Sequence, residues 1–259
     1  MSVLAVFLIA IGVADLTRSA LEQAAREEDH KARARAHWHG AEAGFVTLWV
    51  VAALAGLLGS GSGRLLVAVA MVFVAGWLVV SARALTRDRG HILALSVFAA
   101  GLVVQLALSG WAPDAAGPLG RWMEWAQLPW TPDAGRALLL AGLALVQLST
   151  GNLIVRLVLI STGAMTTAPR AGQPSEQLKG GRLLGPLERL FILGLGLAGQ
   201  VTAAGLVIAA KGLIRWPELR SHSDRTGVHR SDIDTVTEYF LVGSFVSWLV
   251  ALSALVLAR

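Results

Sequence analysis

The 259 residues are 55% hydrophobic and only 15% charged, whereas charged residues approach a quarter of an average soluble domain, so the composition excludes an ordinary water-soluble protein. The net charge of +5 is consistent with nucleic-acid binding, but the basic residues stand in short segments between apolar runs, where they orient helices against anionic lipid, and we expect no nucleic-acid partner. The chain has no cysteine, which excludes disulfides, thiolate metal ligands and a cysteine nucleophile.

Long apolar segments predict an all-α polytopic membrane bundle of about seven transmembrane helices, because about 20 mostly apolar residues form a helix that crosses the hydrocarbon core. The first segment is the weakest, since Asp15 and Arg18 shorten its uncharged stretch. No Lys or Arg precedes it, unlike in a secretory signal peptide, so we expect a retained helix. In chain order the predicted spans are residues 2–20, 42–59, 65–83, 91–110, 136–160, 187–211 and 238–258, in a single membrane domain over 1–259.

The segments between these spans are of three kinds. Residues 21–39 are rich in Ala, Glu, Lys and Arg, which predicts that the first helix continues as a charged helix. Residues 111–130 combine prolines with several tryptophans, a composition typical of an interfacial segment at the level of the lipid headgroups. Residues 161–184 and 217–236 are polar and contain Gly, Pro and Ser, which indicates loops.

The distribution of Lys and Arg predicts that the N-terminus lies outside, since cytoplasmic loops carry an excess of these residues. We expect the protein in the cell inner (plasma) membrane. In that orientation the basic residues gather on the loops that follow the first, third and fifth spans. The segment 212–237 disagrees, because several of its arginines, together with Lys211, would lie outside. Two explanations stay open: the early helices dominate the topology, or the sixth segment does not cross fully.

The sixth predicted span contains a stripe of polar residues. Arg189, Gln200 and Lys211 are spaced by eleven residues, about three helical turns, so a continuous helix would place them on one face. Charged groups are costly in hydrocarbon, so this face should point into the bundle or a wet cavity. The alternative is that Arg189 and Lys211 mark the two membrane surfaces and that Gln200 makes one interhelical hydrogen bond.

The fifth predicted span contains a polar patch from Ser149 to Asn152. Three interpretations are open: a helix break that coordinates a solute, hydrogen bonding between packed helices, or the end of the span followed by an amphipathic helix. The two interpretations without a ligand are favoured. In the seventh span, Gly243, Ser247 and Ala251 form a ladder of small residues that predicts close helix packing.

The remaining polar residues give weaker signals. Asp15 and Arg18 are three residues apart on the first helix, which predicts an ion pair. Glu238 begins the last helix, where it could neutralise Lys211 or Arg215. The histidines follow no metal-ligand spacing and no known catalytic motif is present, so we expect no metal, no cofactor and no catalytic residue.

The C-terminal third resembles an uncharacterised bacterial membrane-protein family, domain of unknown function 3307. The resemblance rests on the runs GRLLGPLERLFILGLGLAGQ (181–200), AAKGLIRWPEL (209–219) and EYFLVGSFVSWLVA (238–251). Trp216 and Ser244 depart from the family pattern, which has Phe and Thr there. The opening helix matches only loosely: Asp15 is present and Leu16 replaces a Phe. The family has no established activity, so the resemblance implies positions without naming their role. The matching positions are Gly185, Leu187, Glu188, Arg189, Gln200, Lys211, Arg215, Glu238, Tyr239, Gly243 and Ser247.

These patterns predict a non-enzymatic multi-pass membrane protein, either a small transporter or channel-like protein or a subunit of a membrane complex. Two alternatives are an intramembrane enzyme or binder that acts on an anionic lipid or lipid-linked phosphate, and a structural or regulatory scaffold. The expected partners are membrane lipids, other membrane subunits or a second copy of the chain. The predicted charge network consists of Glu188, Arg189, Gln200, Lys211, Arg215 and Glu238, together with Asn152 as a candidate binding residue.

Overall fold

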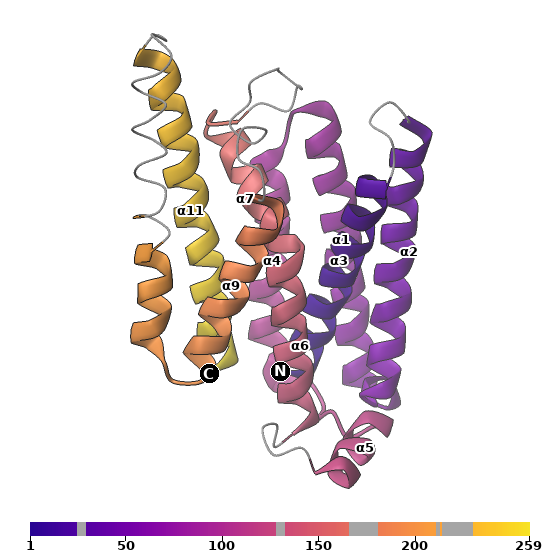
Figure 1. The fold of residues 1–259 in the computed structure, drawn as a ribbon. Coiled ribbons are helices and arrows are strands. Elements are labelled where there is room, and N and C mark those ends of the chain that lie inside the picture. Colours follow the sequence, from indigo (N-terminus) through magenta and orange to yellow (C-terminus); the bar gives the residue numbers. More distant parts are fainter. Residues whose placement is uncertain (25–29, 128–132, 166–180, 211–212, 214–229) are drawn as a thin grey trace. The chain divides into compact units, whose positions relative to one another are not determined.

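The computed structural model describes the chain outside residues 25–29, 128–132, 166–180, 211–212 and 214–229. Within the described residues every regular element is a helix, which confirms the predicted all-α class (Figure 1). These residues form two compact units, Met1–Thr150 with Ala258, and Gly151–Leu257 with Arg259. Each unit is described by itself below, and the single domain over 1–259 stays a prediction.

The first unit is organised around its N-terminal helix, α1, which packs against α2, α3, α4 and α6 (Figure 1). Small residues allow this close packing: a Cβ atom added at Gly12 of α1 would lie 2.7 Å from Cβ of Leu145 on α6. The elements of this unit are α1 (Ser2–Ala24), α2 (His30–Leu54), η1 (Leu57–Gly59), α3 (Gly61–Arg87), α4 (His91–Ala107), η2 (Leu108–Trp111), α5 (Pro118–Ala126) and α6 (Ala134–Leu148).

Capping side chains fix where two of these helices begin. Ser60 precedes α3, and its Oγ accepts a 3.0 Å hydrogen bond from the backbone N–H of Gly63. Asp133 precedes α6 and accepts one of 2.6 Å from the N–H of Arg136. Each cap satisfies a backbone donor that has no partner inside its own helix.

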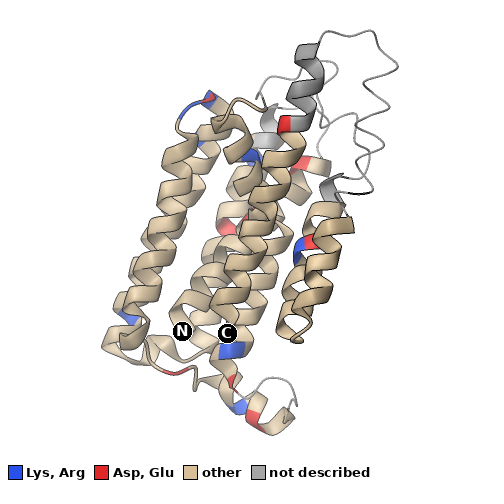
Figure 2. Ribbon diagram, turned by 90° about the vertical axis from the view of Figure 1, so that its left-hand side faces the viewer, with Lys and Arg blue, Asp and Glu red and all other residues tan. Residues whose placement is uncertain are grey.

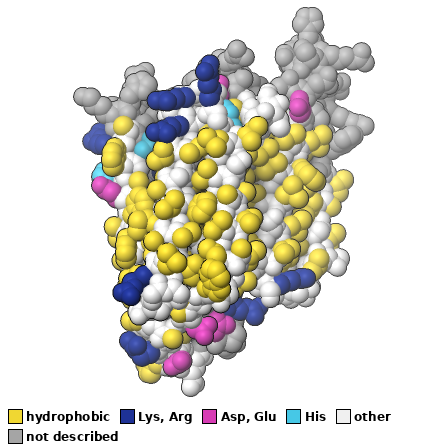
Figure 3. All heavy atoms as spheres, turned by 180° about the vertical axis from the view of Figure 1, so that it is seen from behind, with side chains coloured by type: hydrophobic (Ala, Val, Ile, Leu, Met, Phe, Trp, Pro, Cys, Tyr) yellow, Lys and Arg dark blue, Asp and Glu magenta, His cyan; other side chains and the backbone are white. Residues whose placement is uncertain are grey.

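The outer surface of the first unit is apolar along α3 and α4. Exposed side chains there include Leu65, Val72, Ile92 and Val103, whose exposure in water would be unfavourable. Figure 3 shows hydrophobic side chains across the middle of one face, with Lys and Arg gathered towards its two ends. Most charged positions also lie near helix ends in Figure 2. This distribution is that of helices surrounded by lipid.

The short helix α5 lies in the segment predicted to be interfacial. It buries Gly120 and Met123, whereas Trp122 and Trp125 are exposed. Trp111, just before it, is also exposed. Exposed indoles beside a short helix favour contact with lipid headgroups, where an amphipathic ring is most stable. Trp130 lies outside the described residues, and the interfacial location stays a prediction.

The second unit contains α7 (Thr150–Ser161), taken from Gly151 onward, α9 (Gly181–Leu197), a short helix over Val201–Ala210 and α11 (Arg230–Ala258). The predicted continuous helix over 187–211 is wrong. After Leu197 the chain turns at Gly199, whose φ of 75° is left-handed. The N–H of Gln200 donates to the carbonyl of Leu195, and the N–H of Gly199 donates to the carbonyl of Gly196. These bonds are typical of a helix that ends at a glycine.

In the part of the chain that the structure describes, four helices are long and apolar enough to cross a membrane, and a fifth is counted if α6 and α7 form one span broken at Ser149. The four are Ser2–Ala24, Gly61–Arg87, His91–Trp111 and Glu238–Ala258. The structure therefore supports a membrane protein, while the predicted count of about seven is not confirmed among the described residues. The second predicted span, 42–59, is not among the four, since α2 ends at Leu54 and the first half of this helix is charged. The sixth is divided at Gly199.

Candidate functional site

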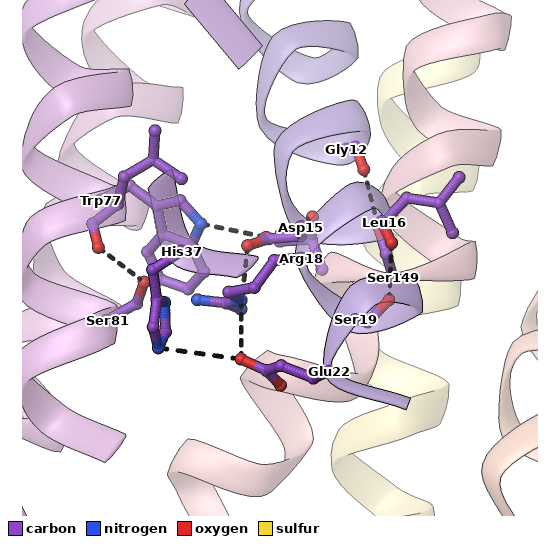
Figure 4. Close-up of polar contacts among 12 residues, drawn as sticks. Gly12, Asp15, Leu16, Arg18, Ser19, Glu22, His37, Trp77, Ser81 and Ser149 are labelled. Atoms are coloured by element: carbon purple, nitrogen blue, oxygen red, sulfur yellow. Dashed lines mark hydrogen bonds and ion pairs between the residues drawn. The ribbon is translucent and has the colours of Figure 1, made fainter. Parts of the chain in front are cut away.

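The first unit contains a buried ion pair of Asp15 and Arg18, which Figure 4 shows together with Trp77. With Thr150, which also bonds to Asp15, these residues form what we call the Asp15 cluster. Nη2 of Arg18 lies 3.0 Å from Oδ1 of Asp15, which confirms the predicted pair. Oδ2 of Asp15 accepts two hydrogen bonds, one of 3.1 Å from Nε1 of Trp77 and one of 2.8 Å from Oγ1 of Thr150. Three helices therefore converge on one carboxylate.

Burial makes this arrangement energetically demanding. Asp15 is 2% exposed and Arg18 is 6% exposed, so both charges have lost nearly all contact with solvent. Removing a charge from water costs several kcal/mol even after relaxation, and this cost is recovered only with good geometry and further hydrogen bonds. The indole and the threonine hydroxyl supply those bonds.

The break between α6 and α7 lies directly beside this cluster. Ser149 ends α6, and its Oγ donates a 2.9 Å hydrogen bond to the backbone carbonyl of Gly12 on α1. The next residue, Thr150, donates to Asp15. The predicted polar interruption of this helix is therefore present. Its contacts are those expected of hydrogen bonding between packed helices, while coordination of a solute stays a prediction.

Two further ionisable groups extend from the Asp15 cluster to a half-exposed position (Figure 4). Nε of Arg18 lies 3.9 Å from Oε1 of Glu22, and the same carboxylate oxygen lies 3.7 Å from Nε2 of His37 on α2. Burial, and secondarily the positive charge of Arg18, lower the pKa of His37 from its ordinary value of 6.5, although Glu22 opposes this shift. His37 is therefore neutral at physiological pH.

The second unit has a buried guanidinium of its own, the Arg189 cluster of Asn152, Arg189 and Ser247. Nη2 of Arg189 donates a 2.7 Å hydrogen bond to Oδ1 of Asn152, and Nη1 donates one of 3.1 Å to Oγ of Ser247. Arg189 is only 1% exposed. Gly151 leaves room for the guanidinium, because an added Cβ would lie 2.8 Å from its Nε atom. The lack of a side chain at Gly151 therefore lets the backbone approach the guanidinium of Arg189 closely.

The predicted charge network is brought together only in part. Arg189 contacts Asn152, whereas the neighbouring Glu188 accepts a 2.8 Å hydrogen bond from Nε1 of Trp248. Gln200 is exposed on the turn after α9, so its predicted place on a continuous stripe is wrong. Glu238 is exposed. Lys211 and Arg215 lie outside the described residues.

Sequence patterns miss some members of both clusters. Trp77 carries no signal of its own, because an indole in an apolar helix is ordinary. Ser247 is expected only as part of a packing ladder, yet its hydroxyl accepts from Arg189. The other members of that ladder do pack closely, Gly243 beside Leu159 and Ala251 in an apolar cluster with Ile192. In the part of the chain that the structure describes, no three His, Asp or Glu side chains are grouped to hold a metal ion.

The described residues form an all-helical fold with buried charged groups, and its long apolar helices support a membrane protein. No protein-family model, curated protein or solved structure matches it. The resemblance of its C-terminal third to domain of unknown function 3307 therefore stays a prediction.

The hydrogen bond from Trp77 to Asp15 leads to a direct prediction. Replacing Trp77 with Phe keeps a ring that can stack on Phe98, whose centroid lies 5.2 Å from that of the indole, but removes the N–H donor. We expect a loss of about 1.5–3 kcal/mol in the free energy of unfolding, the range for a hydrogen bond to a charged group. Denaturant titration in mixed micelles measures it.

The matched control for this prediction is Trp125→Phe, because Trp125 is 81% exposed on α5. Its effect should fall within the small range of surface substitutions. Equal stability of the two variants would show that the indole N–H contributes nothing to holding Asp15.

Proposed function

We propose that this chain is a non-enzymatic multi-pass protein of the inner (plasma) membrane, of the small-transporter or channel-like class, in which the Asp15 cluster handles a polar solute. The observation that carries the proposal is a buried carboxylate and guanidinium on an apolar helix, beside the broken helix at Ser149. Ionisable residues inside membrane helices mark solute or proton pathways, and helix breaks at membrane depth occur where backbone and hydroxyl groups line such a site.

Stability alone is a poor explanation for this ion pair. Replacing a buried pair with apolar residues of similar volume is often neutral or stabilising, because the desolvation of both ions is then avoided. Before Asp15, α1 buries apolar residues from Val3 to Ile11 and at Ala14, so an apolar side chain suits this part of the helix. The presence of two charges at this buried position therefore favours a role in binding a polar solute or in its passage across the membrane.

The two alternatives have less support. A lipid-phosphate binder would use the guanidinium of Arg189, but its Nη1 and Nη2 atoms already donate to Ser247 and Asn152, and a phosphate would have to displace them. A scaffold or complex subunit needs no buried ion pair. Membrane lipids are the expected neighbours of the apolar surface, and assembly with other subunits or a second copy is a further proposal.

Water access to the helix break tests the proposed function. Because the chain has no cysteine, Ser149→Cys introduces a single thiol of nearly the same size at the break. A solute pathway predicts that a positively charged, membrane-impermeant thiosulfonate modifies this cysteine in proteoliposomes, since the reagent must reach the Asp15 cluster through water. Mass spectrometry of the intact protein measures the modified fraction.

Two other single-cysteine variants serve as the unreactive and the fully reactive control for this measurement. Ala70→Cys, at a fully buried position on α3 packed among apolar residues, should stay unmodified, whereas Ser109→Cys, in η2 at the end of α4, should react fully. Protection of Ser149→Cys equal to that of Ala70→Cys would contradict a water-accessible site and favour the scaffold alternative.

A further inference from the structure

Four titratable side chains form a series that leads from a half-exposed position in the first unit to its buried centre. The side chains of His37 and Glu22 are 27% and 34% exposed, whereas those of Arg18 and Asp15 are 8% and 1% exposed. Each lies within 4.0 Å of the next, at 3.7, 3.9 and 3.0 Å in order. Figure 4 shows these side chains turned towards one another.

Two carboxylates flank a single guanidinium in this series. Arg18 lies 3.0 Å from Asp15 and 3.9 Å from Glu22, and His37 lies 3.7 Å from the same Glu22 carboxylate. Burial and Arg18 lower the pKa of His37, so its imidazole is neutral at physiological pH and can take up a proton as the pH falls.

The charged groups that act on the pKa of His37 are Arg18, which lowers it, and Glu22, which raises it. From α3 the neighbouring side chains are Trp77 and Ser81, which carry no charge (Figure 4). Thr150, which contacts Asp15, is also uncharged. On α2, Arg35 is exposed.

Building on the proposed solute-handling role, we propose that the coupling ion of the Asp15 cluster is the proton, and that it enters at His37 and Glu22. A proton from hydronium binds a ring nitrogen of His37: one O–H bond of the hydronium breaks and one N–H bond forms. The imidazolium then pairs with Glu22. Before this step Arg18 interacts with the carboxylates of both Glu22 and Asp15. After it, Arg18 pairs with Asp15 alone.

The direction of the pH effect follows from the environment of His37. Its pKa lies below 6.5 in the folded protein because burial and Arg18 disfavour the imidazolium, whereas the unfolded chain binds the proton at about the ordinary value. The unfolded state therefore binds more protons as the pH falls below 6.5. The stability contributed by neutral His37 is fully present above that pH and is lost as the pH falls through the folded pKa.

Glu22 is the residue that distinguishes a coupled site from a merely buried histidine. Its carboxylate raises the pKa of His37, so Glu22→Gln should lower that pKa further. The histidine pKa is measured by NMR titration of protein labelled at its histidines, in micelles. The resonance of His37 is the one that disappears in His37→Gln.

His39 provides the matched control. It lies on the same helix, is exposed, and has its own carboxylate partner, Glu42, at 3.1 Å. His39→Gln should leave the titration of His37 unchanged. A His37 pKa at or above 6.5, or a pKa that does not fall in Glu22→Gln, would overturn the proposal.

The second measurement connects the proton to the site. The modification rate of Ser149→Cys, divided by that of Ser109→Cys to remove thiol ionisation, is measured between about pH 5 and about pH 8. We expect a several-fold change in this ratio, which is abolished by His37→Gln and retained in His39→Gln. A ratio that does not depend on pH overturns proton coupling while leaving the proposed function intact. A Ser149→Cys thiol that reacts at no pH contradicts the proposed function, and the NMR titration still reports on His37.

Discussion

Replacing Asp15 with Ala lowers the free energy of unfolding by about 3–5 kcal/mol, the range for removing one partner of a buried ion pair. The guanidinium of Arg18 would stay 6% exposed with Glu22 as its remaining carboxylate, 3.9 Å from Nε. The Trp77 N–H and the Thr150 hydroxyl would lose their acceptor at the same time. Denaturant titration in mixed micelles measures the loss.

A double variant separates the ion pair from the burial of its atoms. Asp15→Ala combined with Arg18→Met removes both charges and keeps most of the volume, so its cost should be clearly smaller than the sum of the single costs. Asp114→Ala, at an exposed aspartate, is the control. If Asp15→Ala is no more destabilising than Asp114→Ala, the buried pair does not hold these helices together.

Much of the helical architecture is predictable from hydropathy. The third, fourth and seventh predicted spans correspond to α3, α4 with η2, and the C-terminal part of α11. Each is a long apolar run that ends at charged or turn-forming residues, which is the pattern that lipid requires. The prediction is good where composition alone decides the structure.

The sixth span shows where hydropathy is insufficient. Its sequence LGLGLAGQ contains three glycines in an apolar run, and each of them is compatible with a helix interior. Only Gly199 adopts a left-handed conformation here and ends α9. Because the polar stripe assumed an unbroken helix between Arg189 and Gln200, one backbone angle invalidates the predicted alignment of the two residues.

Local spacing predicts contacts within a helix but not between helices. Asp15 and Arg18 are one turn apart, so their pairing follows from helical geometry. Trp77 is 62 residues from Asp15, and only the packing of α3 against α1 brings its indole to the carboxylate. The same reason explains why Asn152 and Arg189 are both singled out by the sequence but not as partners.

The other large effect is expected at Arg189. Replacing it with Met should cost about 3–5 kcal/mol in the free energy of unfolding, because two hydrogen bonds to a charged group are worth about 1.5–3 kcal/mol each and part is offset by avoided desolvation. Asn152 and Ser247 would lose their donor. Arg64→Met, at an exposed position on α3, is the control and should change stability little.

Gly151 makes this prediction more specific. A methyl group there would lie 2.8 Å from Nε and 3.0 Å from Cζ of Arg189, so Gly151→Ala should destabilise the wild-type protein by displacing the guanidinium from its two acceptors. In the Arg189→Met background the guanidinium is gone, and the same substitution should cost less. A double-mutant cycle measures the coupling, which should be about 0.5–3 kcal/mol for groups in contact. Additive effects of the two substitutions would mean that Gly151 is not required by the guanidinium, and that the backbone at the start of α7 is shaped for another reason.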